Sequence, residues 1–167
     1  GILGGQGGGG AVSAEETALV RIEDAEAISN SATGVASGGF LSAYFAGVVL
    51  LHRVNLRDSH SERGGGGGLF VVATHIFLSQ VHIERCSAGV GGGGGMLVMA
   101  GSHAMLHGGS TMSNNFVRAE TDGNYRAGFG GHIRVAESRV DIFESRLAFK
   151  VPASEPLFPE KVFGGSP

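Results

Sequence analysis

The sequence predicts an all-β fold, a right-handed parallel β-helix of about five coils with a repeat of about 28 residues. Three observations predict it. Runs of glycine recur along the chain, a short apolar segment follows each run, and pairs of apolar residues spaced by two return at a constant interval. Glycine accounts for 31 of the 167 residues, whereas its usual share is about 7%.

The glycine runs mark the start of each repeat, and they lie at residues 7–10, 38–39, 64–68, 91–95 and 130–131. The segments that follow them begin at Ala11, Phe40, Leu69, Met96 and His132. We expect the runs to form a stacked corner, where a Cβ atom would collide or where φ must turn positive.

The apolar pairs supply the predicted core. In the first four repeats they return with the same constant step, at Val20/Ile22, Val48/Leu50, Ile76/Leu78 and Ala104/Leu106. A spacing of two is the strand period, so we expect these pairs to point into one shared interior. A stack of such coils buries an inward row that a single coil leaves exposed.

A polar position keeps the same step, at Asn30, Asp58, Cys86 and Asn114. We interpret this row as a stacked corner whose short polar groups hydrogen-bond the turn backbone, rather than as a ligand set. Cys86 in this row is expected to be a small buried thiol and not a nucleophile, because the local sequence places no histidine beside it.

The coils are predicted to occupy residues 1–150, with an insertion near 118–129, where Thr121-Asp122-Gly123-Asn124 is typical of a turn. Residues 151–167 hold all four prolines and break the repeat. We expect this tail to pack on the outside of the column.

The order Gly-Gly-x-Φ-x-Φ, then Φ-x-Φ, then Asn-x-Ala, where Φ is apolar, resembles the coils of the pectin-lyase-like superfamily, and most closely the polymorphic outer-membrane-protein type of repeat. The best copy runs from Val20-Arg21-Ile22 through Asn30-Ser31-Ala32 to Gly38-Gly39. The resemblance covers residues 7–147 and implies a surface or secreted protein. It is specific for architecture and says little about activity, because such coils serve enzymes, adhesins and structural proteins alike.

Composition excludes several classes. A net charge of -3 with singly scattered basic residues argues against a nucleic-acid partner. No apolar run reaches the length of a transmembrane segment. The single cysteine excludes an intrachain disulfide framework. Residues 5–10 match G-x-G-x-x-G without a strand before or a helix after, so no dinucleotide cofactor is expected, and neither is any other cofactor or a metal.

Two groups of side chains are candidates for metal binding or acid–base catalysis. Stacking predicts that His75 lies beside His103 and that His52 and His107 occupy equivalent places two coils apart. The local group Asp58, His60 and Glu62 is the best acid–base candidate, although it falls on a turn. We predict no catalytic residue and do not expect an enzyme.

Outward positions are unusually apolar. Strands that are apolar on both faces imply a cover. The predicted outer interface consists of Val49, Leu51, Leu69, Val71, Phe77, Met96, Val98 and Met105. The resulting hypothesis is a structural or adhesive module, extracellular or on the cell surface, that self-associates or binds another chain. The alternative is a carbohydrate-active β-helix, either like a polysaccharide lyase or hydrolase or glycan-binding. A row of at least three outward Asp, Glu, Lys or Arg residues on one sheet would favour the enzyme.

Overall fold

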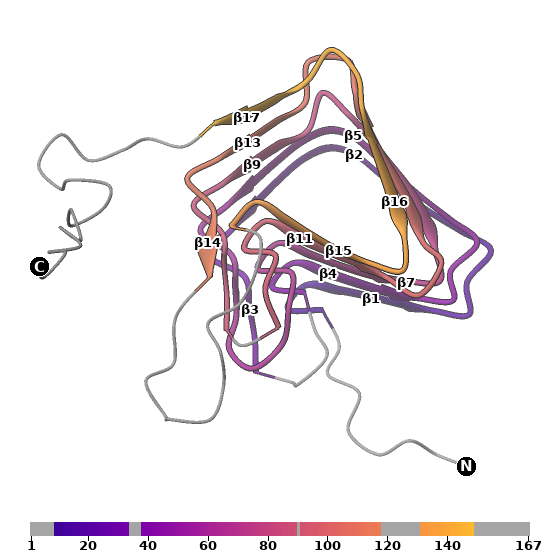
Figure 1. Ribbon diagram of the computed structural model, residues 1–167, viewed down its shortest axis with the longest axis horizontal. Coiled ribbons are helices and arrows are strands. Elements are labelled where there is room, and N and C mark those ends of the chain that lie inside the picture. The colour runs from indigo at the N-terminus through magenta and orange to yellow at the C-terminus, as the bar shows by residue number, and fades with distance from the viewer. Residues whose placement is uncertain (1–8, 34–37, 90, 118–130, 149–167) are drawn as a thin grey trace, which may run out of the picture.

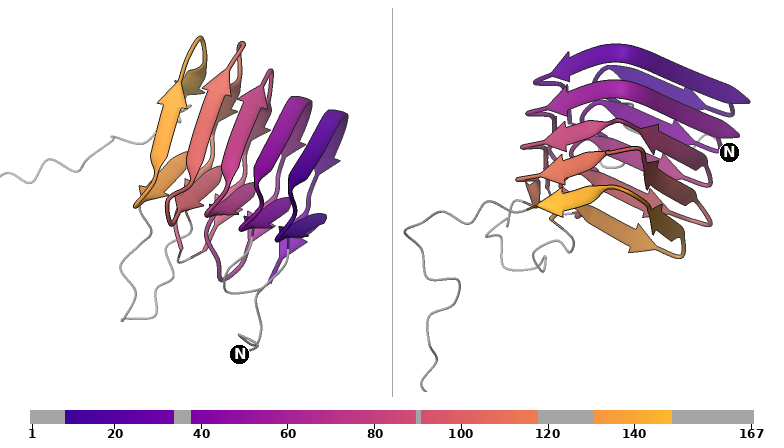
Figure 2. Two further views of the ribbon diagram at one scale, coloured as in Figure 1. Left: turned by 90° about the vertical axis from the view of Figure 1, so that its right-hand side faces the viewer. Right: turned by 90° about the horizontal axis from the view of Figure 1, so that it is seen from above.

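The computed structural model describes residues 9–33, 38–89, 91–117 and 131–148. Every regular element in these residues is a β-strand, and every strand pair is parallel. Successive coils stack side by side (Figure 2). Seen from the C-terminal end, the chain advances toward the viewer counter-clockwise, which is the right-handed sense (Figure 1). The predicted parallel β-helix is confirmed.

Across the described residues, three sheets form the walls of the column. Sheet A contains β1 (Val12–Glu15), β4 (Leu41–Tyr44), β7 (Leu69–Val72), β11 (Met96–Met99) and β15 (Ile133–Ala136). Sheet B contains β2 (Leu19–Ile28), β5 (Val48–Arg57), β8 (His75–Ser79), β9 (His82–Glu84), β12 (His103–His107), β13 (Thr111–Ser113), β16 (Arg139–Ile142) and β17 (Arg146–Ala148). Sheet C contains the two-residue strands β3 (Ser31–Ala32), β6 (His60–Ser61) and β10 (Ser87–Ala88), with β14 (Phe116–Val117).

Sheet B bends and so supplies two sides of the column (Figure 1). Its first limb comprises the N-terminal halves of β2 and β5 with β8, β12 and β16, and its second limb comprises their C-terminal halves with β9, β13 and β17. Sheet A has one strand per coil, so β1 opens the first coil and β15 the last. The three coils between them have a neighbour on both sides.

Three corners per coil carry the turns. In the described part of the chain, all 13 non-glycine residues with positive φ lie at these corners, and they stack in three columns. Corner I follows sheet A, corner II lies at the bend of sheet B, and corner III precedes sheet C. Their members are Glu16, Phe45, Ala73, Ala100 and Glu137 at corner I, Asp24, Arg53, Gln80 and Glu144 at corner II, and Ser29, Asp58, Arg85 and Asn114 at corner III. A residue in the left-handed region reverses the chain within one position.

From the second coil on, a residue just after corner I ties one coil to the next. It follows Phe45, Ala73 and Glu137 directly, and it follows Ala100 one place later because Gly101 intervenes. The Ala46 N–H donates to Thr74 Oγ1, the Thr74 N–H to Ser102 Oγ, and the Ser102 N–H to Ser138 Oγ, each at 3.1 Å. These hydroxyls satisfy turn N–H groups that the strands do not pair. We call this row the hydroxyl ladder.

The glycine runs are needed because two backbones approach closely. A Cβ atom on Gly67 would lie 2.2 Å from the Gly94 carbonyl oxygen and 2.4 Å from the Ser87 carbonyl carbon. Gly10, Gly39 and Gly94 likewise have no room for a Cβ atom, because each lies against the backbone of sheet C. The run before sheet A therefore packs on sheet C in a way that only glycine allows.

The core confirms three of the four predicted apolar pairs. Ile76, Leu78, Ala104 and Leu106 are fully buried. Val20 and Ile22 of the first coil are partly buried and pack against the same core cluster. The prediction for Val48 and Leu50 is wrong. Both lie outside, while Val49 and Leu51 point inward.

The cause is an uneven repeat. Val20 pairs with Val49, one residue further along than the average repeat places its partner, and Val49 pairs with Ile76, one residue short of it. Counting a constant 28 residues from Val20 therefore identifies the inward residues correctly in the third and fourth coils, but in the second coil it selects Val48 instead of Val49. A slip of one residue exchanges the two faces of a strand.

Sheet A has apolar residues on both faces, and the chain provides its own cover. Leu69, Val71, Met96 and Val98 point inward. On the outer face Tyr44, Phe70 and Leu97 form a second small cluster with Val72 and Met99. Gly65 lies directly over Leu97, since a Cβ atom there would come within 2.1 Å of Leu97 Cδ2. The predicted insertion at 118–129 and the tail at 151–167 lie outside the described residues.

Candidate binding surfaces

Of the eight residues predicted to form an outer interface, six lie in the interior. Val49, Leu51, Leu69, Val71, Met96 and Val98 are no more than 1% exposed. Their predicted outward orientation is wrong, because Val49 and Leu51 follow the uneven repeat and the other four lie on the inner face of sheet A. Phe77 and Met105 lie on the outside, partly exposed, as predicted.

The first limb of sheet B presents a mixed outer face. Leu50, Phe77 and Met105 are consecutive partners in the sheet and form an apolar stripe. His75 and His103 lie on one side of this stripe, and their ring centroids are 6.1 Å apart, as the stacking argument predicted. On the other side Ser79 separates His52 from His107. A shallow groove of about 340 Å³ lies beside Phe77, and His52, Ser79 and His107 line it.

Asp141 closes this face at the last coil. It accepts hydrogen bonds from His103 Nε2 at 2.8 Å and from Arg139 Nε at 2.9 Å. The hydrogen bond from Arg139, with that from His103, lowers the pKa of Asp141 below its ordinary value. This carboxylate is therefore charged and occupied at neutral pH, which does not suit it to general acid catalysis.

The second limb of sheet B carries two adjoining polar grooves of about 400 and 410 Å³. Asn55 and His82 line both grooves, and Thr111 continues the same column of the sheet. His82 Nδ1 lies 2.7 Å from Thr111 Oγ1. The grooves also include Arg53, Gln80, Gly108 and Gly109 at one end and Arg57, Glu84 and Ser113 at the other.

Among the described residues this limb lacks the row of at least three outward charged residues that would favour a carbohydrate-active enzyme, because only Arg57 and Glu84 are adjacent partners in a column. Glu26, Arg57, Glu84 and Arg146 occupy outward columns of the same face. Arg57 pairs with Glu26. Positive and negative groups thus alternate and neutralise one another, so the face is polar without a strong net charge.

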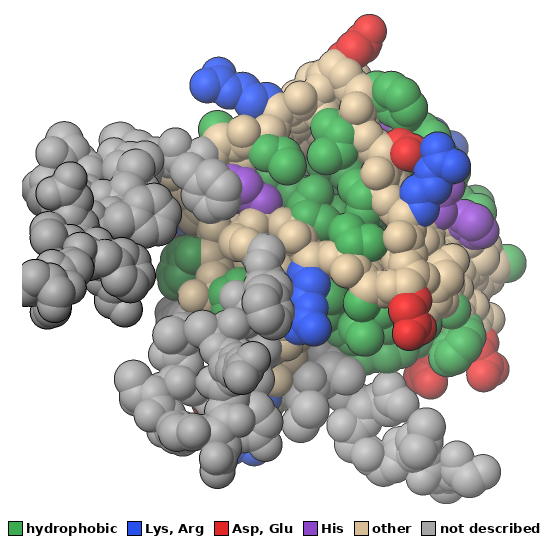
Figure 3. Space-filling model, viewed as in Figure 1, with side chains coloured by type: hydrophobic (Ala, Val, Ile, Leu, Met, Phe, Trp, Pro, Cys, Tyr) green, Lys and Arg blue, Asp and Glu red, His purple; other side chains and the backbone are tan. Residues whose placement is uncertain are grey.

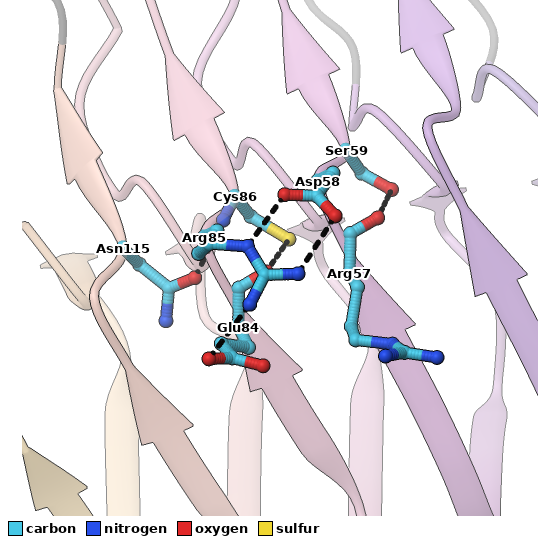
Figure 4. A network of polar contacts seen from close by, with 7 residues as sticks. All are labelled: Arg57, Asp58, Ser59, Glu84, Arg85, Cys86 and Asn115. Atoms are coloured by element: carbon cyan, nitrogen blue, oxygen red, sulfur yellow. Dashed lines mark hydrogen bonds and ion pairs between the residues drawn. The ribbon is translucent and has the colours of Figure 1, made fainter.

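Corner III holds a network of polar contacts (Figure 4). Arg85 donates to both oxygens of Asp58, at 2.8 and 2.9 Å, and also pairs with Glu84 at 2.8 Å. Arg85 lowers the pKa of Asp58 through these hydrogen bonds. The predicted acid–base group does not assemble, because Asp58 bonds to Arg85 while His60 lies against Ser87.

The predicted polar row at this corner proves to be two rows. Ser29, Asp58, Arg85 and Asn114 have positive φ. The following residues, Asn30, Ser59, Cys86 and Asn115, form the row beside them. Asn115 Oδ1 accepts from the Cys86 N–H at 2.8 Å, and Asn115 Nδ2 donates to the Ile83 carbonyl at 2.9 Å. Of the predicted row, Cys86 hydrogen-bonds the turn backbone through its thiol, which donates to the Glu84 carbonyl at 3.5 Å, whereas Asn30 bonds to Ser59 Oγ and Asp58 to Arg85.

Cys86 is fully buried. Burial raises the pKa of its thiol to about 12. A thiol with so high a pKa is a poor nucleophile. Within the described ranges no three histidine, cysteine or carboxylate side chains are grouped to hold a metal ion. None of the described segments forms a helix with the length and apolarity needed to cross a membrane.

The C-terminal end of the column exposes core positions. Val98, Leu106 and Met112 are at most 1% exposed, but their partners in the last coil, Val135, Ile142 and Leu147, are 42–45% exposed. Apolar side chains gather in the middle of this end, inside a rim of charged groups (Figure 3). The sequence predicted open ends but did not identify these residues.

Sequence reasoning missed the grooves of the second limb. The step from Asn55 to His82 is shorter than the average repeat and the step from His82 to Thr111 is longer, so a constant repeat does not align the three. The polar residues of corner II, which precedes the second limb, were the available signal, because polar residues such as Asp24, Arg53 and Gln80 are typical of turns.

The fold and its surfaces define a parallel β-helix with an open apolar end and a polar outer limb. Searches of family models, of curated proteins and of solved structures find no match to this chain. The geometry of these surfaces is therefore the basis for the function proposed below.

Proposed function

We propose that this chain is a structural or adhesive module of a surface or secreted protein, and that it joins other chains through its open C-terminal end. The contrast in exposure between the last coil and the inner coils carries the proposal. The resemblance of the coils to the pectin-lyase-like superfamily, and to repeats of the polymorphic outer-membrane-protein type, supports only the surface or secreted setting, because such coils serve enzymes, adhesins and structural proteins alike.

Leaving apolar core positions exposed to water costs free energy. Burying an aliphatic side chain stabilises a protein by about 1.5–3 kcal/mol. Val135, Ile142 and Leu147 forgo a large part of this contribution in the isolated column. Among the described strands, β15, β16 and β17 are also the edge strands at this end, and edge strands present backbone groups that a further strand can pair. A contact that covers this end satisfies both needs.

Sedimentation velocity over a range of protein concentrations tests the proposal. The native chain should associate as concentration rises, and Ile142→Lys should remain dispersed at the same concentrations. Phe45→Lys is the matched control, because Phe45 is 65% exposed at corner I, on the side of the column. A native chain that stays monomeric, or a Phe45→Lys variant that disperses equally, would overturn the proposal.

A second candidate function is recognition of a polysaccharide by the polar grooves of the second limb. Amide, imidazole and hydroxyl groups repeat there at the strand spacing of about 4.8 Å, from Asn55 through His82 to Thr111. Such groups both donate and accept hydrogen bonds, as sugar hydroxyls require.

Affinity electrophoresis in gels that contain neutral or uronate polysaccharides tests this candidate. The native chain should be retarded by at least one polysaccharide, and Asn55→Ala combined with His82→Ala should abolish the retardation. His75→Ala, on the first limb, is the control and should behave as the native chain does. Retardation that survives the double substitution would remove the grooves as the site.

A further inference from the structure

The two ends of the column are chemically different, and the hydroxyl ladder shows how. Along corner I each N–H donates to a hydroxyl of the next coil, and the ladder reaches Ser138 in the last coil. The ladder therefore runs in one direction, with its N–H groups directed toward the C-terminal end. A further coil beyond the last would have to offer a hydroxyl to the Ser138 N–H.

The first coil offers such a hydroxyl. Thr17 follows the corner residue Glu16, as Thr74 follows Ala73, and it is exposed. The Thr17 hydroxyl donates to the Glu15 carbonyl at 3.0 Å, just as the Thr74 hydroxyl donates to the Val72 carbonyl at 2.9 Å. Because a hydroxyl that donates one bond still accepts others, Thr17 has the geometry of a ladder member.

The apolar columns match in the same register. Val135, Ile142 and Leu147 end the columns that begin with Ala14, Ile22 and Ala27 in the first coil. Placing a first coil on the last coil therefore continues these three columns. Two of the three contacts place a large exposed side chain, that of Val135 or Leu147, in line with an alanine of the first coil, Ala14 or Ala27.

Charges on the rim do not decide the contact. In this register Asp141 would face Arg21 and Arg146 would face Glu26, two attractive pairs. Against them, Glu137 would face Glu16 and Glu144 would face Asp24 at the corners. Exposed pairs of either sign contribute at most about 1 kcal/mol, so two of each nearly cancel. The apolar columns and the ladder then determine the orientation.

We infer that the open C-terminal end binds the first coil of a second copy of this chain, head to tail, with the Ser138 N–H donating to Thr17 Oγ1 of the next copy. This inference rests on the proposed function and names its partner. A head-to-tail contact is heterologous and does not close on itself, so it propagates into a filament.

Cysteine cross-linking tests the orientation. Thr17→Cys and Ser138→Cys are prepared as separate variants, mixed, and oxidised. Neighbouring strands lie about 4.8 Å apart, within the Cα–Cα range of about 4.4–6.8 Å that a disulfide spans. The native Cys86 is buried and does not compete.

Head-to-tail stacking predicts a disulfide dimer in the mixture, with Cys at position 17 joined to Cys at position 138 by mass spectrometry, and little dimer in either variant alone. A Thr17→Cys, Ser138→Cys double variant should give a ladder of oligomers. If Ser138→Cys alone forms the dimer, the ends meet tail to tail, and the inference fails while the proposed function stands. If nothing associates in sedimentation, both fail.

A milder substitution checks the hydrogen bond itself. Thr17→Val keeps the shape of the side chain and removes the hydroxyl, and association should weaken about fivefold, the weight of one neutral hydrogen bond. Thr33→Val is the matched control, because Thr33 is an exposed threonine of the same coil outside corner I. Equal weakening in both variants would contradict the assigned contact.

Discussion

The orientation of β5 allows a sharp test, because Leu50 and Leu51 are adjacent and lie on opposite faces of one strand. Leu51 is fully buried in the core, while Leu50 lies partly exposed on the outer stripe beside Phe77. Replacing a buried leucine with alanine costs about 2–5 kcal/mol, because packing is lost and a cavity remains. The half-buried Leu50 should cost about 1 kcal/mol.

Urea denaturation followed by far-ultraviolet circular dichroism measures both values. The Leu51→Ala midpoint should fall well below that of Leu50→Ala, with similar slopes if the unfolded states are alike. Val49→Ala and Val48→Ala give a second comparison within the same strand and should rank in the same order. If Leu50→Ala is the more damaging substitution, the register of the second coil is wrong.

Three further predictions concern single positions. Gly67→Ala should destabilise the fold by more than about 3 kcal/mol, since two backbones must separate, whereas Gly101→Ala, with open space around it and only a positive φ, should cost about 1–2 kcal/mol; chemical denaturation ranks them. Arg85 depresses the pKa of Asp58 in the folded state, so the pair's contribution is complete above the unfolded pKa of about 3.9 and is lost as pH falls through the folded value. Asp58→Asn should therefore reduce the loss of stability below about pH 4 in acid titrations. Cys86 should react with a thiol reagent only as fast as the protein opens, because the thiol is buried and its pKa is raised to about 12.

The sequence predicted the fold class because the average repeat is regular, and it predicted the phase where polar and apolar residues alternate. In β8 the polar residues His75 and Ser79 alternate with Ile76 and Leu78, and only one phase is possible. In β5 the first four residues are all apolar, so periodicity gives no phase. The orientation of β5 was therefore predicted from the average repeat length alone, which placed the inward residue at Val48 instead of Val49.

The same physical limit explains the error on sheet A. β7 and β11 consist entirely of apolar residues, and one face of each had to be covered. The glycine-rich run of the chain itself lies over Leu97, and Phe70 packs with Tyr44 in the same outer cluster. A sequence of glycines carries no apolar signal, so it was not recognised as a covering layer and a partner chain was expected instead.

The grooves and the open end were inaccessible for a different reason. Both depend on which residues become neighbours between coils, and that is set at the corners rather than by the number of residues in a repeat. The step between equivalent positions is one residue longer than the average repeat at Val20 and Val49, one residue shorter at Val49 and Ile76, and equal to it at Ile76 and Ala104. The turns absorb the difference, because a corner turns the chain with one positive-φ residue or with two, as at Ala100-Gly101 and Gly108-Gly109. At corner I the next residue is small or carries a hydroxyl, as at Ala46 and Thr74. Aligning such sequences from corner to corner, with a small inward residue as the anchor, fixes the phase of each strand even where the strand itself is uniformly apolar.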